Sequence, residues 1–399
     1  MSIICSVRRL RPFLALVGAA LVLAGVPTAL PAVAAPIRSA PDVPARLATL
    51  QALEERRSQE VTDAISRRDD VRRRLDTARG LAETARARTD QLSVRAAEAA
   101  ARYETARRRV GELAAVAYRG GADQSQLMMV LDIESLGDYA YRRELVERVG
   151  ERQRNAVRTA QRERATATAL ADEARAERNR LVGVVDALTR ALPDRETAVT
   201  TAQVALARVE VWRERWEAIA GGTATTIMGR PALTPDELAT WFTATRRRAR
   251  LTVSISELAR YYVEEGSAVG VRGDIAFAQS ILETGSLWFP DGGQVLPTDN
   301  NFAGMGACDS CASGDDFPDA RTGVRAQVQQ LRVYADPSLT NAMLNPPAVN
   351  PRLDAHFLKG RVPTWGGLTH TWATASTYGD RILAIYGEIL AWHTDRARL

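Results

Sequence analysis

One carboxylic acid stands where its surroundings can tune its chemistry. The mainly apolar run 275–282 predicts a helix that places Glu283 at its end, just before a Thr-Gly break. Apolar surroundings raise the pKa of a carboxylic acid and can keep it protonated near neutral pH. Such an acid can protonate a leaving oxygen, as cleavage of a glycosidic bond requires. The alternative for a lone Glu is a solvated side chain at a helix end.

A polar loop follows this helix and delivers a second motif, Asn-Phe-Ala-Gly-Met, which begins at Asn301. The amide of Asn301 could hydrogen-bond the amide of an acetylated sugar. A plain turn with Phe302 buried is the alternative. Three tryptophans in the C-terminal part of the chain could stack on sugar faces, although core packing is the more ordinary role for at least one of them. They are Trp288, Trp365 and Trp372.

Two of these segments resemble those of a known family. The segment Gln-x-x-x-Glu-Thr-Gly around Glu283 and the segment Asn-x-x-Gly-apolar at Asn301 are similar to those of the peptidoglycan N-acetylglucosaminidases. These enzymes are grouped with mannosyl-glycoprotein endo-beta-N-acetylglucosaminidase domains and have a lysozyme-like fold. The resemblance covers the C-terminal part of the chain. It implies that Glu283 is the catalytic acid and that Asn301, Phe302 and Gly304 contact the sugar.

A closing segment, residues 372–378, resembles the same family in part. Trp372 stands where the family has a first Tyr, and Ala375 stands where an Asp is common. The role of that Asp is therefore not carried over to this chain. Tyr378 matches a later Tyr that approaches the site. The resemblance implies a catalytic role for Tyr378 and a substrate contact for Trp372, while a buried Tyr with a satisfied hydroxyl is the alternative.

The identity of a second catalytic carboxylate stays open. Inverting chemistry needs a base about 6.5–9.5 Å from the acid, and retaining chemistry needs a nucleophile about 5–5.5 Å away. Spacing selects none of the five candidates in the loop region after Glu283, which are Asp291, Asp299, Asp309, Asp315 and Asp316. A substrate whose own N-acetyl group attacks would need no protein nucleophile. We favour that route, in which Tyr378 would steady the developing charge.

The cysteines favour a disulfide over a metal site. Cys308 and Cys311 form a C-x-x-C pair, and in an exported chain such a pair predicts a local disulfide. A closed zinc site needs four ligands. The three histidines are too far apart in sequence to complete one; they are His356, His370 and His393. We therefore expect no metal and no cofactor.

The beginning of the chain predicts export. A basic start and an apolar run over residues 13–26 precede an Ala-x-Ala site, which predicts a signal peptide over residues 1–34. An uncleaved anchor is the alternative. We expect the mature protein to be secreted and to work at the cell wall. The whole sequence has a net charge of +5, and a mildly basic secreted protein suits an anionic wall polymer. The spread of the arginines argues against nucleic-acid binding.

The first half of the chain predicts a coiled coil. After a linker at 35–44, apolar residues recur in alternating steps of four and three, and this heptad pattern predicts a coiled-coil arm over residues 45–220. A break near residues 120–123 predicts an antiparallel hairpin. Its tip, residues 125–141, is unusually apolar and is either a self-packed lobe or a docking surface for a membrane protein.

A new domain is predicted to begin after a flexible linker at 221–233. Thr234 is a predicted N-cap, followed by Pro at the first helical position and by Glu237 three residues after the cap. We expect an all-α chain in which the antiparallel coiled-coil hairpin is followed by a lysozyme-like, mainly helical catalytic domain at 234–396.

The expected function combines these parts. The resemblance implies a secreted hydrolase that cleaves N-acetylglucosaminyl bonds in peptidoglycan glycan strands, with the arm in a regulatory or positioning role. Two alternatives stay open. A lytic transglycosylase would use the same Glu283 and leave anhydro-sugar ends. A non-catalytic scaffold would bind wall glycan without cutting it.

Overall fold

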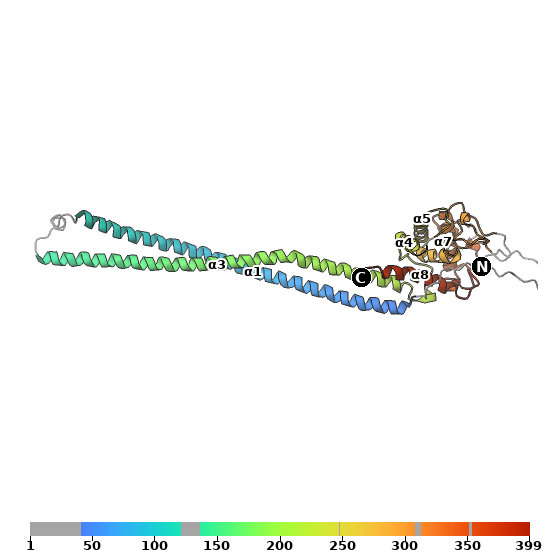
Figure 1. The fold of residues 1–399 in the computed structure, drawn as a ribbon, viewed down its shortest axis with the longest axis horizontal. Helices are drawn as coiled ribbons and strands as arrows, with labels where there is room; N and C mark the ends of the chain where they lie inside the picture. The colour runs from blue at the N-terminus through green and yellow to red at the C-terminus, as the bar shows by residue number, and fades with distance from the viewer. Residues whose placement is uncertain (1–40, 121–135, 247, 308–312, 351–352) are drawn as a thin grey trace, which may run out of the picture. The chain divides into compact units, whose positions relative to one another are not determined.

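The computed structural model describes residues 41–120, 136–246, 248–307, 313–350 and 353–399, and within these ranges the regular structure is helical (Figure 1). The helices are α1 (Val43–Gly120), α3 (Leu136–Glu217), α4 (Pro235–Thr245), α5 (Ile255–Ala268), α6 (Gly273–Glu283), α7 (Ala320–Ala335) and α8 (Tyr378–Thr394). The described part of the chain contains isolated β-bridges and no β-strand. This confirms the predicted helical hairpin followed by a helical domain.

The chain divides into two compact units. Residues 59–203 form the first, called here the hairpin unit. Residues up to 58 and residues 204–399 form the second, called here the C-terminal unit. The start of α1 and the end of α3 therefore belong to the C-terminal unit rather than to the hairpin unit.

The hairpin unit is a pair of antiparallel helices with a narrow apolar seam. Its buried side chains are mostly small, and they include Val71, Leu75, Ala78, Ala99, Ala160, Ala171, Ala174, Leu181 and Val199. The Thr89 hydroxyl, also buried, donates a hydrogen bond to the Ala174 carbonyl across the pair (3.1 Å). Small seam residues allow this close approach of two helices, in agreement with the heptad pattern.

In the C-terminal unit, helix α6 occupies the core. All of its residues from Gly273 to Ile281 are buried, and α5, α7 and α8 pack against it. Gly273 makes one of these contacts possible, because a Cβ there would lie 1.9 Å from the Tyr262 carbonyl oxygen on α5. A helix buried on every side is held rigidly, and this one ends at Glu283.

The ends of the two long helices are part of this core. Trp216, near the end of α3, is fully buried and donates its indole N–H to the Thr394 hydroxyl on α8 (3.0 Å). On the start of α1, Leu50 is buried in the same cluster, and Glu54 pairs with Arg213 of α3 (2.6 Å). The base of the predicted arm thus packs directly on α8.

Residues 221–233, for which the sequence predicts a flexible linker, are packed in the structure. Ile227 is 0% exposed and Leu233 is 1% exposed. Isolated bridges join Thr226 to Thr364 and Met228 to Val271. The Gly and Thr residues that suggested a linker instead let the chain turn closely against the domain. After them, Thr234 caps α4 in the predicted capping box.

A buried ionic group fixes the beginning of α6. Arg272 donates to the carbonyl of Ala218, just after α3 (2.9 Å), and to the hydroxyl of Tyr386 on α8 (3.0 Å). Asp274, which is fully buried, accepts from the Tyr386 hydroxyl (2.5 Å) and from the backbone N–H of Ala232 (2.8 Å). Because its partners lie just after α3, at residue 232 and on α8, this group ties the beginning of α6 to three other segments.

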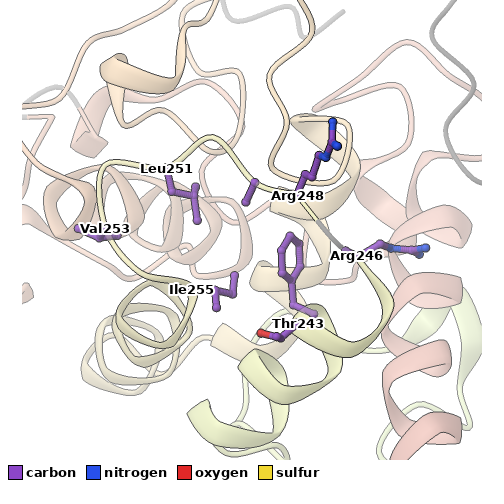
Figure 2. A pocket seen from close by; sticks show the side chains of 8 residues that line it. Thr243, Arg246, Arg248, Leu251, Val253 and Ile255 are labelled. Carbon is purple, nitrogen blue, oxygen red and sulfur yellow. The ribbon is translucent and has the colours of Figure 1, made fainter.

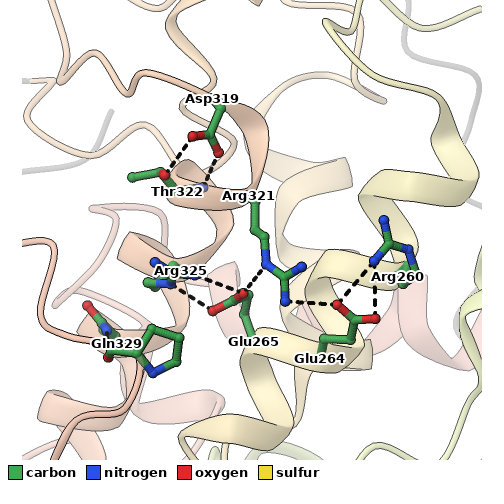
Figure 3. A network of polar contacts seen from close by, with 9 residues as sticks. Arg260, Glu264, Glu265, Asp319, Arg321, Thr322, Arg325 and Gln329 are labelled. Atoms are coloured by element: carbon green, nitrogen blue, oxygen red, sulfur yellow. Dashed lines mark hydrogen bonds and ion pairs between the residues drawn. The ribbon is translucent and has the colours of Figure 1, made fainter.

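A second ionic group joins α5 to α7 (Figure 3). Glu265 is 1% exposed and accepts hydrogen bonds from the guanidinium groups of Arg321 and Arg325. Arg321 also reaches Glu264 (2.9 Å). Although burial alone would raise the pKa of Glu265, the hydrogen bonds from Arg325 and Arg321 bring it below its ordinary value. Glu265 is therefore held as a carboxylate.

Several predictions from the sequence lie outside the described residues. They are the signal peptide at 1–34, the linker at 35–44 up to residue 40, most of the tip at 125–141, and the pair Cys308 and Cys311. Within the described part, no helix is both long enough and apolar enough to cross a membrane.

Candidate active site

Glu283 is the last residue of α6, and the turn after it is built by local hydrogen bonds. The Thr284 hydroxyl donates to the Ser280 carbonyl (2.6 Å) and accepts from the Leu287 N–H (2.8 Å). Gly285 follows with a φ of +60°, which glycine adopts without strain. The Thr-Gly break read from the sequence is thus a defined turn that ends the helix directly after Glu283.

The surroundings of Glu283 suit a proton donor. Its side chain is only partly exposed, and burial raises its pKa to about 7. A hydrogen bond from Tyr378 and the positive charge of Arg381 act in the opposite direction but are weaker. Near neutral pH this carboxyl group can therefore keep its proton, as a general acid requires.

Tyr378 is the first residue of α8, is 4% exposed, and donates its hydroxyl hydrogen to Oε1 of Glu283. Burial, together with the neighbouring charge of Glu283, raises the pKa of Tyr378 well above its ordinary value. The hydroxyl therefore stays protonated and acts as a donor. The structure thus brings together the two residues that the sequence singled out as catalytic, from positions 95 residues apart.

Behind this pair lie three buried polar side chains. The Gln279 amide donates to the Tyr378 hydroxyl (2.9 Å), the Gln327 amide donates to Gln279 (2.8 Å), and the Tyr262 hydroxyl donates to Gln327 (2.6 Å). The sequence points to Gln279 only as part of the family motif, and it does not single out Gln327 or Tyr262. A signal was present at Gln327, which shares the apolar face of α7 with Val324 and Leu331.

The side chain of Asn301 forms hydrogen bonds with the backbone of its own loop. Its amide N–H groups donate to the carbonyls of Met305 (2.8 Å) and Asp315 (2.9 Å). Its carbonyl accepts from the backbone N–H of Met305 (3.0 Å) and of Ala303 (3.3 Å). Asn301 is 1% exposed, so its amide fastens the loop and faces away from solvent. Gly304 is part of this loop and has a φ of +64°.

The aromatic residues expected at the sugar are mostly in the core. Phe302 is 1% exposed and lies edge-on to Tyr262. Trp372 is fully buried and donates its indole N–H to the Ala303 carbonyl (3.2 Å), so it supports the Asn301 loop from beneath. Trp365 is also fully buried, whereas Trp288, shortly after Glu283, is 39% exposed. Among the three candidates for sugar stacking, Trp288 is the accessible one.

The candidates for a second carboxylate differ in their surroundings. Asp291 is exposed and pairs with Arg250 (2.8 Å), and Asp299 accepts from the Leu296 N–H (2.7 Å). Partial burial raises the pKa of Asp315, whose backbone is bonded to the Asn301 loop. Asp309 lies outside the described residues.

An open pocket of about 280 Å³ lies where α4 leads into α5 (Figure 2). Its lining is mainly apolar, with two arginines, and consists of Phe242, Thr243, Arg246, Arg248, Ala249, Leu251, Val253 and Ile255. Arg246 pairs with Glu388 of α8 (3.1 Å). None of the residues that hold Glu283 lines this pocket.

In the described part of the chain, no group of three or more His, Cys, Asp or Glu side chains could hold a metal ion.

Comparison with known proteins places a family domain over this site. Residues 259–390 match the model of the family described as glucosaminidase, mannosyl-glycoprotein endo-beta-N-acetylglucosaminidase. An uncharacterised protein of Borreliella burgdorferi is 34% identical over 140 residues, which span 35% of this chain and 65% of that relative. The chain thus spans slightly less than two thirds of this relative. No solved structure matches.

Proposed function

We propose that the protein is a secreted glycoside hydrolase that cleaves N-acetylglucosaminyl bonds in peptidoglycan glycan strands, a proposal supported by the match of residues 259–390 to the glucosaminidase family model. The observation that carries the proposal is Glu283. It ends a rigid buried helix, stays partly exposed, and has a pKa raised by burial to about 7. Those properties suit a group that must protonate a leaving oxygen at neutral pH.

In the proposed reaction, Glu283 gives its proton to the glycosidic oxygen as the bond to the sugar breaks. Tyr378 acts on Glu283 rather than on the sugar, because its hydroxyl already lies between Gln279 and Glu283. Attack on the sugar comes either from water activated by a second carboxylate, with Asp315 as one described candidate, or from the sugar's own N-acetyl oxygen. In the second route, water then opens the cyclic product, giving its hydroxyl to the sugar carbon and its proton to Glu283. Trp288, which is 39% exposed, would be the aromatic residue that stacks on a sugar.

The remaining parts of the proposal concern the rest of the chain. Residues 1–34 would direct export, and the predicted disulfide between Cys308 and Cys311 would close the loop after the Asn301 segment. The hairpin unit would position or restrain the enzyme, with the tip at 125–141 as the docking surface for a membrane protein.

The decisive experiment compares the full mature chain with its Glu283→Gln variant on purified peptidoglycan. General acid catalysis is typically worth about 10²–10⁴-fold, so the variant should lose at least about 10²-fold in turnover while it stays folded. Glu214→Gln, which changes an exposed Glu of α3, is the matched control and should keep its activity. Wild-type activity should fall as the pH rises above about 7, because Glu283 then loses its proton.

Mass spectrometry of the products separates the remaining alternatives. Reducing N-acetylglucosamine ends support hydrolysis, and anhydro-sugar ends would show a lytic transglycosylase. If the wild type binds the wall without releasing fragments, the protein is a scaffold. Activity of Glu283→Gln within a few-fold of the wild type would show that Glu283 is not the acid.

A further inference from the structure

A continuous line of buried hydrogen bonds ends at the candidate acid. It begins at the backbone carbonyl of Ala276 on α6, which accepts from the amide nitrogen of Gln327 (3.3 Å). The same nitrogen donates to the carbonyl of Gln279 (2.8 Å), whose own nitrogen donates to the hydroxyl of Tyr378 (2.9 Å). Tyr378 then donates to Glu283. Both glutamines are 0% exposed, so water does not compete for these bonds.

The backbone carbonyl sets the direction of every bond in this line. A carbonyl oxygen can only accept, so the NH₂ end of the Gln327 amide must face Ala276. If the Gln327 amide were turned over, two oxygens would face each other and the donor to Gln279 would be lost. The Gln279 oxygen therefore faces Gln327, and its NH₂ end faces Tyr378.

A tyrosine hydroxyl has one hydrogen, and here its destination is determined. Because the Tyr378 oxygen already receives a hydrogen from Gln279, its own hydrogen points to Oε1 of Glu283. Oε1 is thus an acceptor, and a proton on this carboxyl group belongs on Oε2. We propose that Gln279 and Gln327 are positioning residues, which act through Tyr378 to place the transferable proton of Glu283 on Oε2.

The use of that proton in catalysis rests on the proposed function, whereas its placement does not. A hydrogen bond from Tyr378 favours the charged carboxylate and so opposes the effect of burial. Among the described residues, the other charged or titratable groups that act on the pair are Arg381 of α8, which favours the carboxylate, and Tyr334 of α7, which acts on Tyr378. Weakening the line of hydrogen bonds should therefore raise the pKa of Glu283.

The test is a carbon-13 NMR titration of glutamate carboxyl groups in the full mature chain, which needs no substrate. The Glu283 signal is identified by its absence from Glu283→Gln. Tyr378→Phe should raise the pKa of Glu283 by about 1–2 units, as loss of a hydrogen bond to a charged group does. Gln279→Met, which keeps the length and removes the N–H donor, should shift it in the same direction by less.

Two comparisons make the test specific. Gln330→Met changes another buried glutamine of α7, one without a partner in this line, and should leave the pKa of Glu283 unchanged. The double variant Gln279→Met with Tyr378→Phe should titrate like Tyr378→Phe alone, because Gln279 acts through Tyr378. An added shift in the double variant, or no shift in Gln279→Met, would overturn the proposal.

Folding is checked by tryptophan fluorescence, and Gln327→Met provides a second variant in case Gln279→Met does not fold. Gln327→Met should also raise the pKa, since Gln279 then loses the partner that orients its amide. Activity on peptidoglycan is measured separately. A protein that fails to cut peptidoglycan but shows these shifts would contradict the proposed function and leave the positioning role intact.

Discussion

The hairpin unit and the C-terminal unit use arginine in different ways. In the hairpin unit, Arg72 reaches across the pair to Glu196 (2.6 Å), with nearly half of each side chain exposed. In the C-terminal unit, Arg272 is 4% exposed and is held by Asp274, Tyr386 and a backbone carbonyl. An exposed ion pair contributes about 0–1 kcal/mol, whereas loss of one partner from a buried pair can cost several kcal/mol.

The two units also differ in how their contacts are distributed. The seam of the hairpin unit repeats similar small contacts along two helices, so no single residue decides its fold. The C-terminal unit depends on a few buried groups that join segments far apart in the sequence, among them Trp216 with Thr394 and Glu265 with Arg325. Single substitutions should therefore have large effects in the C-terminal unit and small effects in the hairpin unit.

The largest effect is expected from Trp216→Ala. Removal of this fully buried ring leaves a cavity and removes the hydrogen bond that the Thr394 hydroxyl accepts, although this hydroxyl still donates to the Leu390 carbonyl. The change should lower the free energy of unfolding of the C-terminal unit by about 3–5 kcal/mol. Urea unfolding followed by tryptophan fluorescence measures this unit alone, since all seven tryptophans lie between residues 212 and 392. Val211→Ala, on an exposed face of α3, is the control and should change little.

The same experiment tests whether the hairpin base belongs to the domain. If Trp216→Ala changed the unfolding free energy by less than about 1 kcal/mol, the end of α3 would be dispensable and the comparison of the units would fail.

An intermediate, pH-dependent effect is expected from Glu265→Gln. The carboxylate is buried, but Arg321 and Arg325 are 42% and 23% exposed and can be hydrated when it is lost. We expect a loss of about 1–3 kcal/mol at pH 7. Because the folded pKa of Glu265 is lowered, this contribution is full above its unfolded pKa and disappears as the pH falls through the folded pKa.

Unfolding free energies of wild type and Glu265→Gln, measured from pH 7 down to about pH 3, check this prediction. The difference between the two proteins should shrink below about pH 4.3, the ordinary pKa of a glutamate. A difference that grew toward acid pH would show that the sign is wrong and that Glu265 is held protonated.

The smallest effect is expected from Arg72→Gln. The Arg72–Glu196 pair is exposed, so its loss should cost less than about 1 kcal/mol, and the difference from the wild type should vanish in high salt. Far-UV circular dichroism during urea unfolding follows the long helices. A loss of more than about 2 kcal/mol would contradict the view that charges in the hairpin unit are individually expendable.

Much of the architecture could be predicted from the sequence because its signals are local. The heptad spacing predicted the helical hairpin, and Thr234 with Glu237 predicted the start of α4. The apolar run before Glu283 predicted a helix that ends at an acid. Each of these depends on residues within a few turns of one another, where side-chain spacing alone determines which groups meet.

The surroundings of Glu283 depended on the tertiary structure. The types of Asn301 and Trp372 suit sugar contacts, yet the first fastens its own loop and the second lies beneath it. The residues at 221–233 have the composition of a linker but are packed against residues far along the chain. The type of a residue determines which groups its side chain is able to bind. Only the packing of the folded chain determines which of these groups it contacts.

The sequence by itself determined the position of the candidate acid, the helix that carries it and the helical class of the chain. The tertiary structure decided how that acid is controlled, because Tyr262, Gln327 and Tyr378 come from three different helices. The direction of a hydrogen bond depends on what lies at its far end, here the carbonyl of Ala276. No spacing along the chain encodes such a contact, since it exists only once α5, α6, α7 and α8 have packed together.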